Sequence, residues 1–225
     1  VIGPAGWGDQ SVVHRMATDW TRALGAREVE ACLARHAGVR AVVFAYADTS
    51  TAVRHDVAAL SRVARAHGAL VLVDAVSSLG GMPFAFDEWD VDFAVTASQK
   101  CLMSSPGQAF VALSERAWAA TKTARLPRNY WDFADIRRNV GKPNPETPGT
   151  PPVHIVLQVA EALRMLHEEG LEEVVLRHEA MAERARSFAA GLGIALQCPD
   201  LGRYSSTLTA ITLPAGVDPK AIREA

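Results

Sequence analysis

Two neighbouring stretches of sequence decide the fold: LVLVDAVSSLGG at residues 70–81 and VDFAVTASQK at residues 91–100. Each opens with a largely apolar, β-branched run and continues into small and polar residues. Continuous apolar runs, unlike alternating ones, are typical of strands in a sheet that is covered on both faces, and such sheets are mostly parallel. The two stretches therefore predict strands of a mainly parallel sheet that carry polar side chains at their carboxyl ends.

Similar runs on either side extend this pattern to an α/β domain. We predict strands at Val39–Tyr46, Ala69–Asp74, Val91–Ala97 and Gln108–Leu113, and a helix at His55–His67 that Gly68 ends. A strand, helix, strand unit of this kind predicts the α/β class, with a mainly parallel sheet covered by helices. Ligands bind at the carboxyl ends of the strands in such folds.

The second half of the chain has a different organisation. Prolines between residues 143 and 152 exclude a helix and indicate an extended, structured loop. We expect a large domain over residues 1–170 and the start of a smaller α+β domain over residues 171–225. The predicted elements here are helices at Val153–Glu169 and Leu171–Leu192 and a strand at Arg203–Leu213. Because the sequence starts without Met and ends just inside a helical pattern, we expect a piece of a longer polypeptide that lacks both ends.

Composition restricts the possible partners of the 225-residue chain. The net charge of −2 provides no basic face for nucleic acid, and no apolar run approaches the roughly 20 residues of a membrane span. Cys32, Cys101 and Cys198 are odd in number and far apart, which predicts neither disulfides nor a metal site and fits a reducing cytoplasm. Small molecules are therefore the expected partners.

Lys100 is set apart from the other lysines by its neighbours. It follows the run at residues 91–97 and precedes Cys101, Leu102 and Met103, so we expect its ammonium group to be poorly hydrated. Desolvation favours the neutral amine, which a lysine needs to attack a carbonyl group as a Schiff-base nucleophile. The alternative is a lysine that extends from a strand end into solvent.

Asp74 ends the preceding predicted strand, so it belongs at the same edge of the sheet as Lys100. A carboxylate there can pair with a pyridinium nitrogen and keep it protonated. The alternative is that Asp74 caps a turn. The serines and glycines at residues 77–81 and 104–107 could donate hydrogen bonds to a phosphate or could simply make turns.

In combination these residues form a recognisable pattern. Residues 73–81, VDAVSSLGG, and residues 96–102, TASQKCL, with Pro106 and Gly107, resemble the class V aminotransferases, and most of all the alanine–glyoxylate and serine–glyoxylate aminotransferases. The resemblance extends over nearly the whole chain. It implies fold type I and the cofactor pyridoxal 5'-phosphate.

The resemblance also implies roles for individual residues around the cofactor. Lys100 would hold the cofactor as a Schiff base and then move the proton between the substrate and the cofactor. Asp74 would bind the pyridine nitrogen, and Gln99 resembles the residue that contacts the cofactor phosphate. Thr49 occupies the position of a hydroxyl residue near the ring oxygen, and Trp7 is similar to the aromatic residue that stacks on the ring, although a core aromatic is the alternative for Trp7.

Two threonines in the proline-rich loop resemble residues that reach the phosphate of the neighbouring subunit. They are Thr150 and, with less weight than a turn-forming role, Thr147. A homodimer with shared sites is therefore implied.

The chain also departs from the family pattern. Between Gln10 and Val13 it is shorter than its relatives by about one or two helix turns, just before a strand that the resemblance places at Val12–Met16. The glycine-rich phosphate loop would precede Val1, and the arginine that binds the substrate carboxylate would follow Ala225. Whether this piece is active by itself is therefore left open.

The expected function is transamination between a small amino acid, alanine or serine, and a small 2-oxo acid such as glyoxylate. A 2-aminoethylphosphonate transaminase is an alternative within the family. A cysteine desulfurase-like lyase is another, but those enzymes usually have a histidine before the lysine, where this chain has Gln99, and Cys198 has no supporting pattern. A non-catalytic α/β binding module for a nucleotide would need a Gly-x-Gly-x-x-Gly turn, which is not found.

Overall fold

A four-stranded sheet organises the first half of the molecule. The computed structural model describes residues 12–126, 128–147 and 149–224. In spatial order the strands are β1 (Ala41–Ala45), β2 (Leu70–Asp74), β3 (Phe93–Ala97) and β4 (Ala109–Leu113). Strands β1, β2 and β3 are parallel, and β4 is antiparallel to β3. All four strands were predicted, and each begins one or two residues later than expected. The α/β class with a mainly parallel sheet is confirmed.

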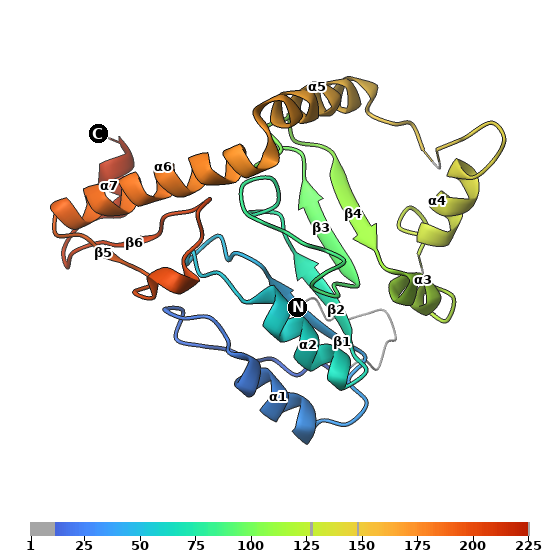
Figure 1. Ribbon diagram of the computed structural model, residues 1–225, viewed down its shortest axis with the longest axis horizontal. Helices are drawn as coiled ribbons and strands as arrows, with labels where there is room; N and C mark the ends of the chain where they lie inside the picture. The colour runs from blue at the N-terminus through green and yellow to red at the C-terminus, as the bar shows by residue number, and fades with distance from the viewer. Residues whose placement is uncertain (1–11, 127, 148, 225) are drawn as a thin grey trace.

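Two helices lie side by side next to β1 and β2 (Figure 1). Helix α1 (Ala26–Arg35) was not predicted, whereas α2 (Val57–Ala66) confirms the helix expected at His55–His67. The side chain of Asp56 accepts a hydrogen bond from the amide of Ala59 and so caps the start of α2. Gly68 follows the helix with a φ of 73°, a conformation that glycine adopts without steric cost.

The central strand β2 is largely buried, but the outer strands of the sheet are covered less completely. In β2 the side chains of Val71 and Val73 are fully buried. In β1, Val42 and Phe44 pack against residues of α1 and α2, while Val43 points to the opposite face and is 62 % exposed. Val111 in β4 is also exposed. The expectation of burial on both faces is therefore wrong for the outer strands, because the described helices cover only one face of β1.

Helices dominate the second half of the chain. Helix α5 (Val153–Glu169) and helix α6 (Leu171–Gly191) confirm the two predicted helices, and residues 143–147 and 149–152 contain neither helix nor strand, as expected. Figure 1 shows α5 beyond the arrowhead of β3. The other elements of this half are α3 (Glu115–Thr121), α4 (Phe133–Val140), β5 (Ala195–Leu196), the 3-10 helix η1 (Leu201–Arg203), β6 (Ile211–Thr212) and α7 (Pro219–Glu224).

Two predicted strands are wrong. Residues 12–16 are irregular, and the expected strand at Arg203–Leu213 is reduced to the two residues of β6, which pair with β5. In the second case a side chain engages a backbone group that a longer strand would use. The hydroxyl of Tyr204 donates to the carbonyl of Ala210 (2.7 Å) and accepts from its amide (2.8 Å), so this amide is not available to a neighbouring strand, while the carbonyl also accepts from the amide of Gln197 (3.0 Å).

A buried carboxylate ties the amino ends of β2 and β3 to the start of α3. Asp92 is fully buried. Its Oδ2 accepts from the amide of Val71 (2.9 Å), and its Oδ1 accepts from the hydroxyl of Ser114 (2.6 Å). The guanidinium groups of Arg65 and Arg116 lie 3.7 and 3.5 Å from the carboxylate oxygens. This network holds the sheet at the end opposite to the carboxyl ends of the parallel strands.

Asp92→Asn is expected to lower the free energy of unfolding by about 1–3 kcal/mol, because an amide cannot accept at both positions and leaves a buried donor unsatisfied. Chemical denaturation of the two proteins measures the difference. Asp90→Asn is the matched control, since Asp90 also pairs with Arg65 but its side chain is 53 % exposed. We expect the control to change stability by less than about 0.5 kcal/mol. Equal losses for the two variants would contradict the role of Asp92.

Candidate active site

The structure brings Asp74 and Lys100 to one edge of the sheet. Asp74 is the last residue of β2 and pairs with Val95 in the neighbouring parallel strand β3. Strand β3 ends at Ala97, and Lys100 lies in the turn that follows. Because parallel strands end at the same edge, the ends of β2 and β3 present both side chains there.

Asp74 is exposed and uses only one of its oxygens within the described chain. Its Oδ1 accepts a hydrogen bond from the amide of Val76 at 2.9 Å, which is the turn-capping contact that we weighed as an alternative. Oδ2 has no hydrogen-bond partner among the described residues, and Asp74 forms no ion pair with Lys100. One carboxylate oxygen is therefore held in place while the other is available to a ligand.

Lys100 is exposed, so the expectation of a poorly hydrated amine is wrong for the described chain. The reason is that Lys100 lies in a turn beyond the strand, where the described residues do not enclose its side chain. Gln99 beside it is also exposed and makes no side-chain hydrogen bond to a described residue. Both side chains are thus accessible to a ligand.

The loop that carries Lys100 is held by Ser98, a residue whose role sequence reasoning missed. Ser98 is fully buried. Its hydroxyl donates to the carbonyl of Ser105 (2.6 Å) and accepts from the amide of Gln108 (3.2 Å), so it closes the loop at its base. The only signal in the sequence is a small hydroxyl residue directly after an apolar strand. On the far side of the loop, Leu102 packs against Leu166 of α5 and Val174 of α6.

Thr49 lies at the same edge because it contacts the turn that follows Asp74. The hydroxyl oxygens of Thr49 and Ser77 are 2.6 Å apart, and either hydroxyl can be the donor. Thr49 is exposed, whereas Ser77 is buried. The structure thus joins the loop after β1 to the turn after β2.

The turn at residues 75–82 uses its own amides. The amides of Ser78 and Leu79 donate to the carbonyl of Ala75 (3.1 and 2.9 Å), and the amide of Gly81 donates to the carbonyl of Ser78 (3.0 Å). Gly80 has a φ of 97°, which favours glycine. Of the two readings of this segment, turn formation therefore accounts for these three amides, and they are not available to a phosphate.

The remaining predicted site residues are not brought to this edge by any described contact. Thr150 is exposed and makes no side-chain hydrogen bond to a described residue. The hydroxyl of Thr147 donates to the carbonyl of Gly149 at 2.7 Å, as a turn-forming threonine does. Trp7 lies outside the described residues.

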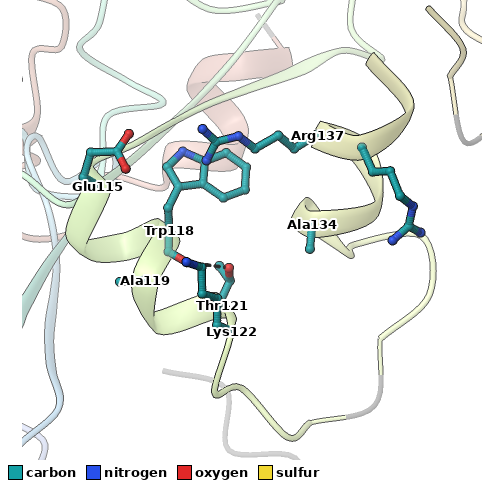
Figure 2. A pocket seen from close by; sticks show the side chains of 8 residues that line it. Glu115, Trp118, Ala119, Thr121, Lys122, Ala134 and Arg137 are labelled. Atoms are coloured by element: carbon teal, nitrogen blue, oxygen red, sulfur yellow. Dashed lines mark hydrogen bonds between the residues drawn. The ribbon is translucent and has the colours of Figure 1, made fainter. Parts of the chain in front are cut away.

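Two cavities lie away from this edge. One, of about 370 Å³, lies between α3 and α4 and is lined by Trp118 and Arg137, whose guanidinium carbon is 4.7 Å from the ring centroid (Figure 2). Since Leu113 pairs with Phe93 at the start of β3, α3 begins at the opposite end of the sheet from Lys100. The other, of about 600 Å³, is lined by residues of α1 and of the segment before it. Neither cavity includes Asp74 or Lys100.

Two absences concern only the part of the chain that the structure describes. There, His, Cys, Asp and Glu side chains form no group of three or more that could hold a metal ion. In the same part, no helix has both the length and the apolar character that crossing a membrane requires.

Comparison with known proteins shows close relatives. The chain is 38% identical over 213 residues to the soluble hydrogenase small subunit of Synechococcus sp. (strain PCC 6716), covering 93% of this chain and 54% of that protein. It is 39% identical over 211 residues to the L-aspartate–glyoxylate aminotransferase of Paracoccus denitrificans (strain Pd 1222), covering 91% and 52%. The chain therefore spans about half the length of the curated relatives it matches.

Solved structures agree with the sequence comparison. The crystal structure of the alanine–glyoxylate aminotransferase from Nostoc sp. matches with a TM-score of 0.86 and 29% sequence identity, over 93% of this chain and 55% of that one. This similarity identifies the fold as that of the fold type I pyridoxal-phosphate aminotransferases. The sequence profile described as "Aminotransferase class-V" matches residues 10–220. Because this match covers nearly the whole chain, the protein belongs to the class V aminotransferases.

Proposed function

We propose that the full-length protein is a pyridoxal-phosphate-dependent aminotransferase that transfers the amino group of a small amino acid, alanine or serine, to a small 2-oxo acid such as glyoxylate. One observation carries the proposal: the accessible amine of Lys100 and the accessible carboxylate of Asp74 follow the ends of adjacent parallel strands without pairing with each other. The names of the two aminotransferases reported above, in which glyoxylate is a substrate, support the choice of acceptor.

The described residues fit the cofactor chemically. An accessible primary amine can attach to the aldehyde, and a carboxylate with one free oxygen can hold a proton on the ring nitrogen. When bound, pyridoxal phosphate supplies an electron sink for the substrate carbon. The hydrogen bond from the Val76 amide fixes the carboxylate of Asp74, so its second oxygen is presented without rotation. We assign Gln99 and Thr150 to the phosphate, Thr49 to the ring oxygen and Trp7 to the face of the ring.

Lys100 has a second role in this proposal. With the cofactor bound, Nζ of Lys100 would act as the base that accepts the proton from the substrate Cα. Proton abstraction requires the neutral amine, which desolvation favours.

We further propose a homodimer that works in the cytoplasm. Thr150 is exposed on the proline-rich segment, and we assign it to the phosphate site of the second subunit. Cys32, Cys101 and Cys198 are free thiols, which suits a reducing compartment. The division into a large domain over residues 1–170 and a small domain from residue 171 remains part of this proposal.

The cysteine desulfurase-like alternative is disfavoured by the state of the thiols. Such a lyase needs a reactive thiolate that is accessible to substrate. Cys198 is fully buried, and burial raises the pKa of its thiol. Burial also raises the pKa of the Cys101 thiol, which lies next to Lys100. Cys198 and Cys101 are therefore less suited than an exposed thiol to serve as the nucleophile of such a lyase.

A donor and acceptor screen on the full-length protein tests the proposed function. The purified protein is loaded with pyridoxal phosphate and mixed with alanine, serine, aspartate or 2-aminoethylphosphonate, and the loss of the near-visible cofactor band is followed for each donor. Glyoxylate or pyruvate is then added, and the amino product is measured. We expect turnover with alanine or serine and glyoxylate. A protein that shows the band but transfers no amino group from these donors would overturn the proposal, and preference for the phosphonate would favour the alternative transaminase.

A further inference from the structure

We propose that Thr207, in the segment between η1 and β6, is a positioning residue for the cofactor edge. It holds Ser77, and through Ser77 it sets the place of Thr49. The inference rests on the proposed function, because it concerns the edge of the sheet where we place pyridoxal phosphate. It adds a residue from the C-terminal part of the chain that no sequence motif indicates.

The contact between the two regions is direct. The hydroxyl of Thr207 donates to the backbone carbonyl of Ser77 at 2.5 Å, although the two residues are 130 positions apart in the sequence. The side chain of Ser77 in turn lies 2.6 Å, oxygen to oxygen, from the hydroxyl of Thr49. Thr207 therefore restrains the residue that meets Thr49.

The hydroxyl of Thr207 also has a hydrogen-bond partner on its own segment, the hydroxyl of Ser205. The oxygens of Ser205 and Thr207 are 2.9 Å apart, and the amide of Thr207 donates to the Ser205 hydroxyl at 3.2 Å. Since the single proton of the Thr207 hydroxyl is given to Ser77, the proton between the two side chains must come from Ser205. The sulfur of Met82, 3.3 Å from the Ser205 oxygen, is the weaker acceptor. The result is a chain from Ser205 through Thr207 to Ser77, in which each hydrogen bond polarises the next.

Gly81 provides independent support for this close approach. Its φ is not among the positive values, so the backbone conformation does not demand glycine. Glycine is needed here because the surrounding atoms leave no room for a side chain. A Cβ atom at this position would lie 2.6 Å from Cγ2 of Thr207, 3.0 Å from Sγ of Cys101 and 3.1 Å from Cδ2 of His178. The Thr207 segment, the loop of Lys100 and helix α6 therefore converge on the turn after Asp74.

The consequence is that the C-terminal segment controls the turn that presents the site. Residues 75–82 follow Asp74 directly, and the amides of Ser78, Leu79, Gly81 and Met82 donate to carbonyls within the segment. The C-terminal segment reaches this turn through the hydroxyl of Thr207, which donates to the carbonyl of Ser77. Without it, the carbonyl of Ser77 keeps only the weak contact from the thiol of Cys101 at 3.9 Å. The turn then gains freedom, which weakens the preorganisation of Thr49 and Asp74 for the cofactor.

The test compares Thr207→Val, Thr207→Ser and Thr121→Val in the full-length protein. Valine keeps the shape of threonine without the hydroxyl, and serine keeps the hydroxyl. Thr121 is the matched control, because its hydroxyl also donates to a backbone carbonyl, that of Trp118 at 2.8 Å, but in α3 at the far end of the sheet. The dissociation constant for pyridoxal phosphate is measured by titration of the near-visible band. Amide hydrogen exchange of the peptide covering residues 75–82 is measured in the protein freed of cofactor.

We expect Thr207→Val to weaken cofactor binding about fivefold, the factor that corresponds to one neutral hydrogen bond, and to speed exchange in residues 75–82. Thr207→Ser should restore both values, and Thr121→Val should change neither. Unchanged exchange and affinity in Thr207→Val would overturn the inference. Faster exchange with unchanged affinity would also overturn it, since Thr207 would then be merely structural. If the parent protein binds no pyridoxal phosphate, the proposed function itself fails, and the inference fails with it.

Discussion

Replacing Lys100 by Ala in the full-length protein is expected to lower the rate of transamination by on the order of a thousandfold or more and to abolish the covalent attachment of pyridoxal phosphate. The substitution removes both the nucleophile for the aldehyde and the base for the substrate proton. Steady-state kinetics measure the first effect. Borohydride reduction followed by peptide mass mapping measures the second, and the cofactor mass should appear on Lys100 in the parent protein only.

The other lysines make this test selective. Lys142 pairs with Glu146 and Lys220 pairs with Glu224, whereas Lys100 pairs with no described carboxylate. Lys122 is the control for substitution, because it is exposed at the end of α3, on the side of the sheet away from Asp74. Lys122→Ala should keep the parent rate within about twofold, as a surface change far from the site does. A cofactor adduct on another lysine, or full activity in Lys100→Ala, would show that the roles are wrongly assigned.

Replacing Asp74 by Asn is expected to lower kcat by about a hundredfold while leaving the free energy of unfolding nearly unchanged. Asparagine keeps the oxygen that accepts from the Val76 amide, so the turn is retained. It loses the negative charge that would keep the ring nitrogen protonated, and with it the electron-withdrawing power of the ring. The measurements are the rate of the amino-donor half-reaction and a denaturation curve.

Asp74→Ala separates the two roles of this carboxylate further. It removes the charge and the cap together, so it should match Asp74→Asn in activity and in addition lose about 1 kcal/mol of stability. The near-visible band should persist in both variants, since Lys100 is still present to hold the cofactor. If Asp74→Asn kept the parent activity, Asp74 would be a turn cap and nothing more.

Local sequence patterns were enough to predict much of the scaffold and the placement of Asp74 and Lys100 at one edge of the sheet. Strands β2 and β3 and helices α2, α5 and α6 lie where apolar runs and helical periodicity indicated them. Once two neighbouring strands are taken as parallel, the residues at their ends must share an edge of the sheet. This is why Asp74 and Lys100 could be placed together before any coordinates were known.

Errors arose where burial or pairing depends on a distant segment. Val43 has the character of a buried strand residue, but α1 and α2 cover only the other face of β1. Residues 203–213 are β-branched enough to predict a strand, yet the Tyr204 hydroxyl accepts from the amide of Ala210 and the strand shrinks to the two residues of β6. The β-propensity of a segment shows only that its residues fit a strand. Whether the strand forms also depends on a neighbouring strand that pairs with it.

The sequence by itself determined the class of the fold and the positions of its main strands, and it placed Lys100 and Asp74 at the carboxyl edge of the sheet, because these follow from local periodicity and from the geometry of parallel strands. Only the tertiary structure decided that Lys100 is exposed, that Ser98 closes its loop and that Thr207 meets Ser77 from 130 residues away. The physical reason is that hydrogen bonds between hydroxyls and backbone carbonyls depend on tenths of an ångström between segments that no local pattern relates.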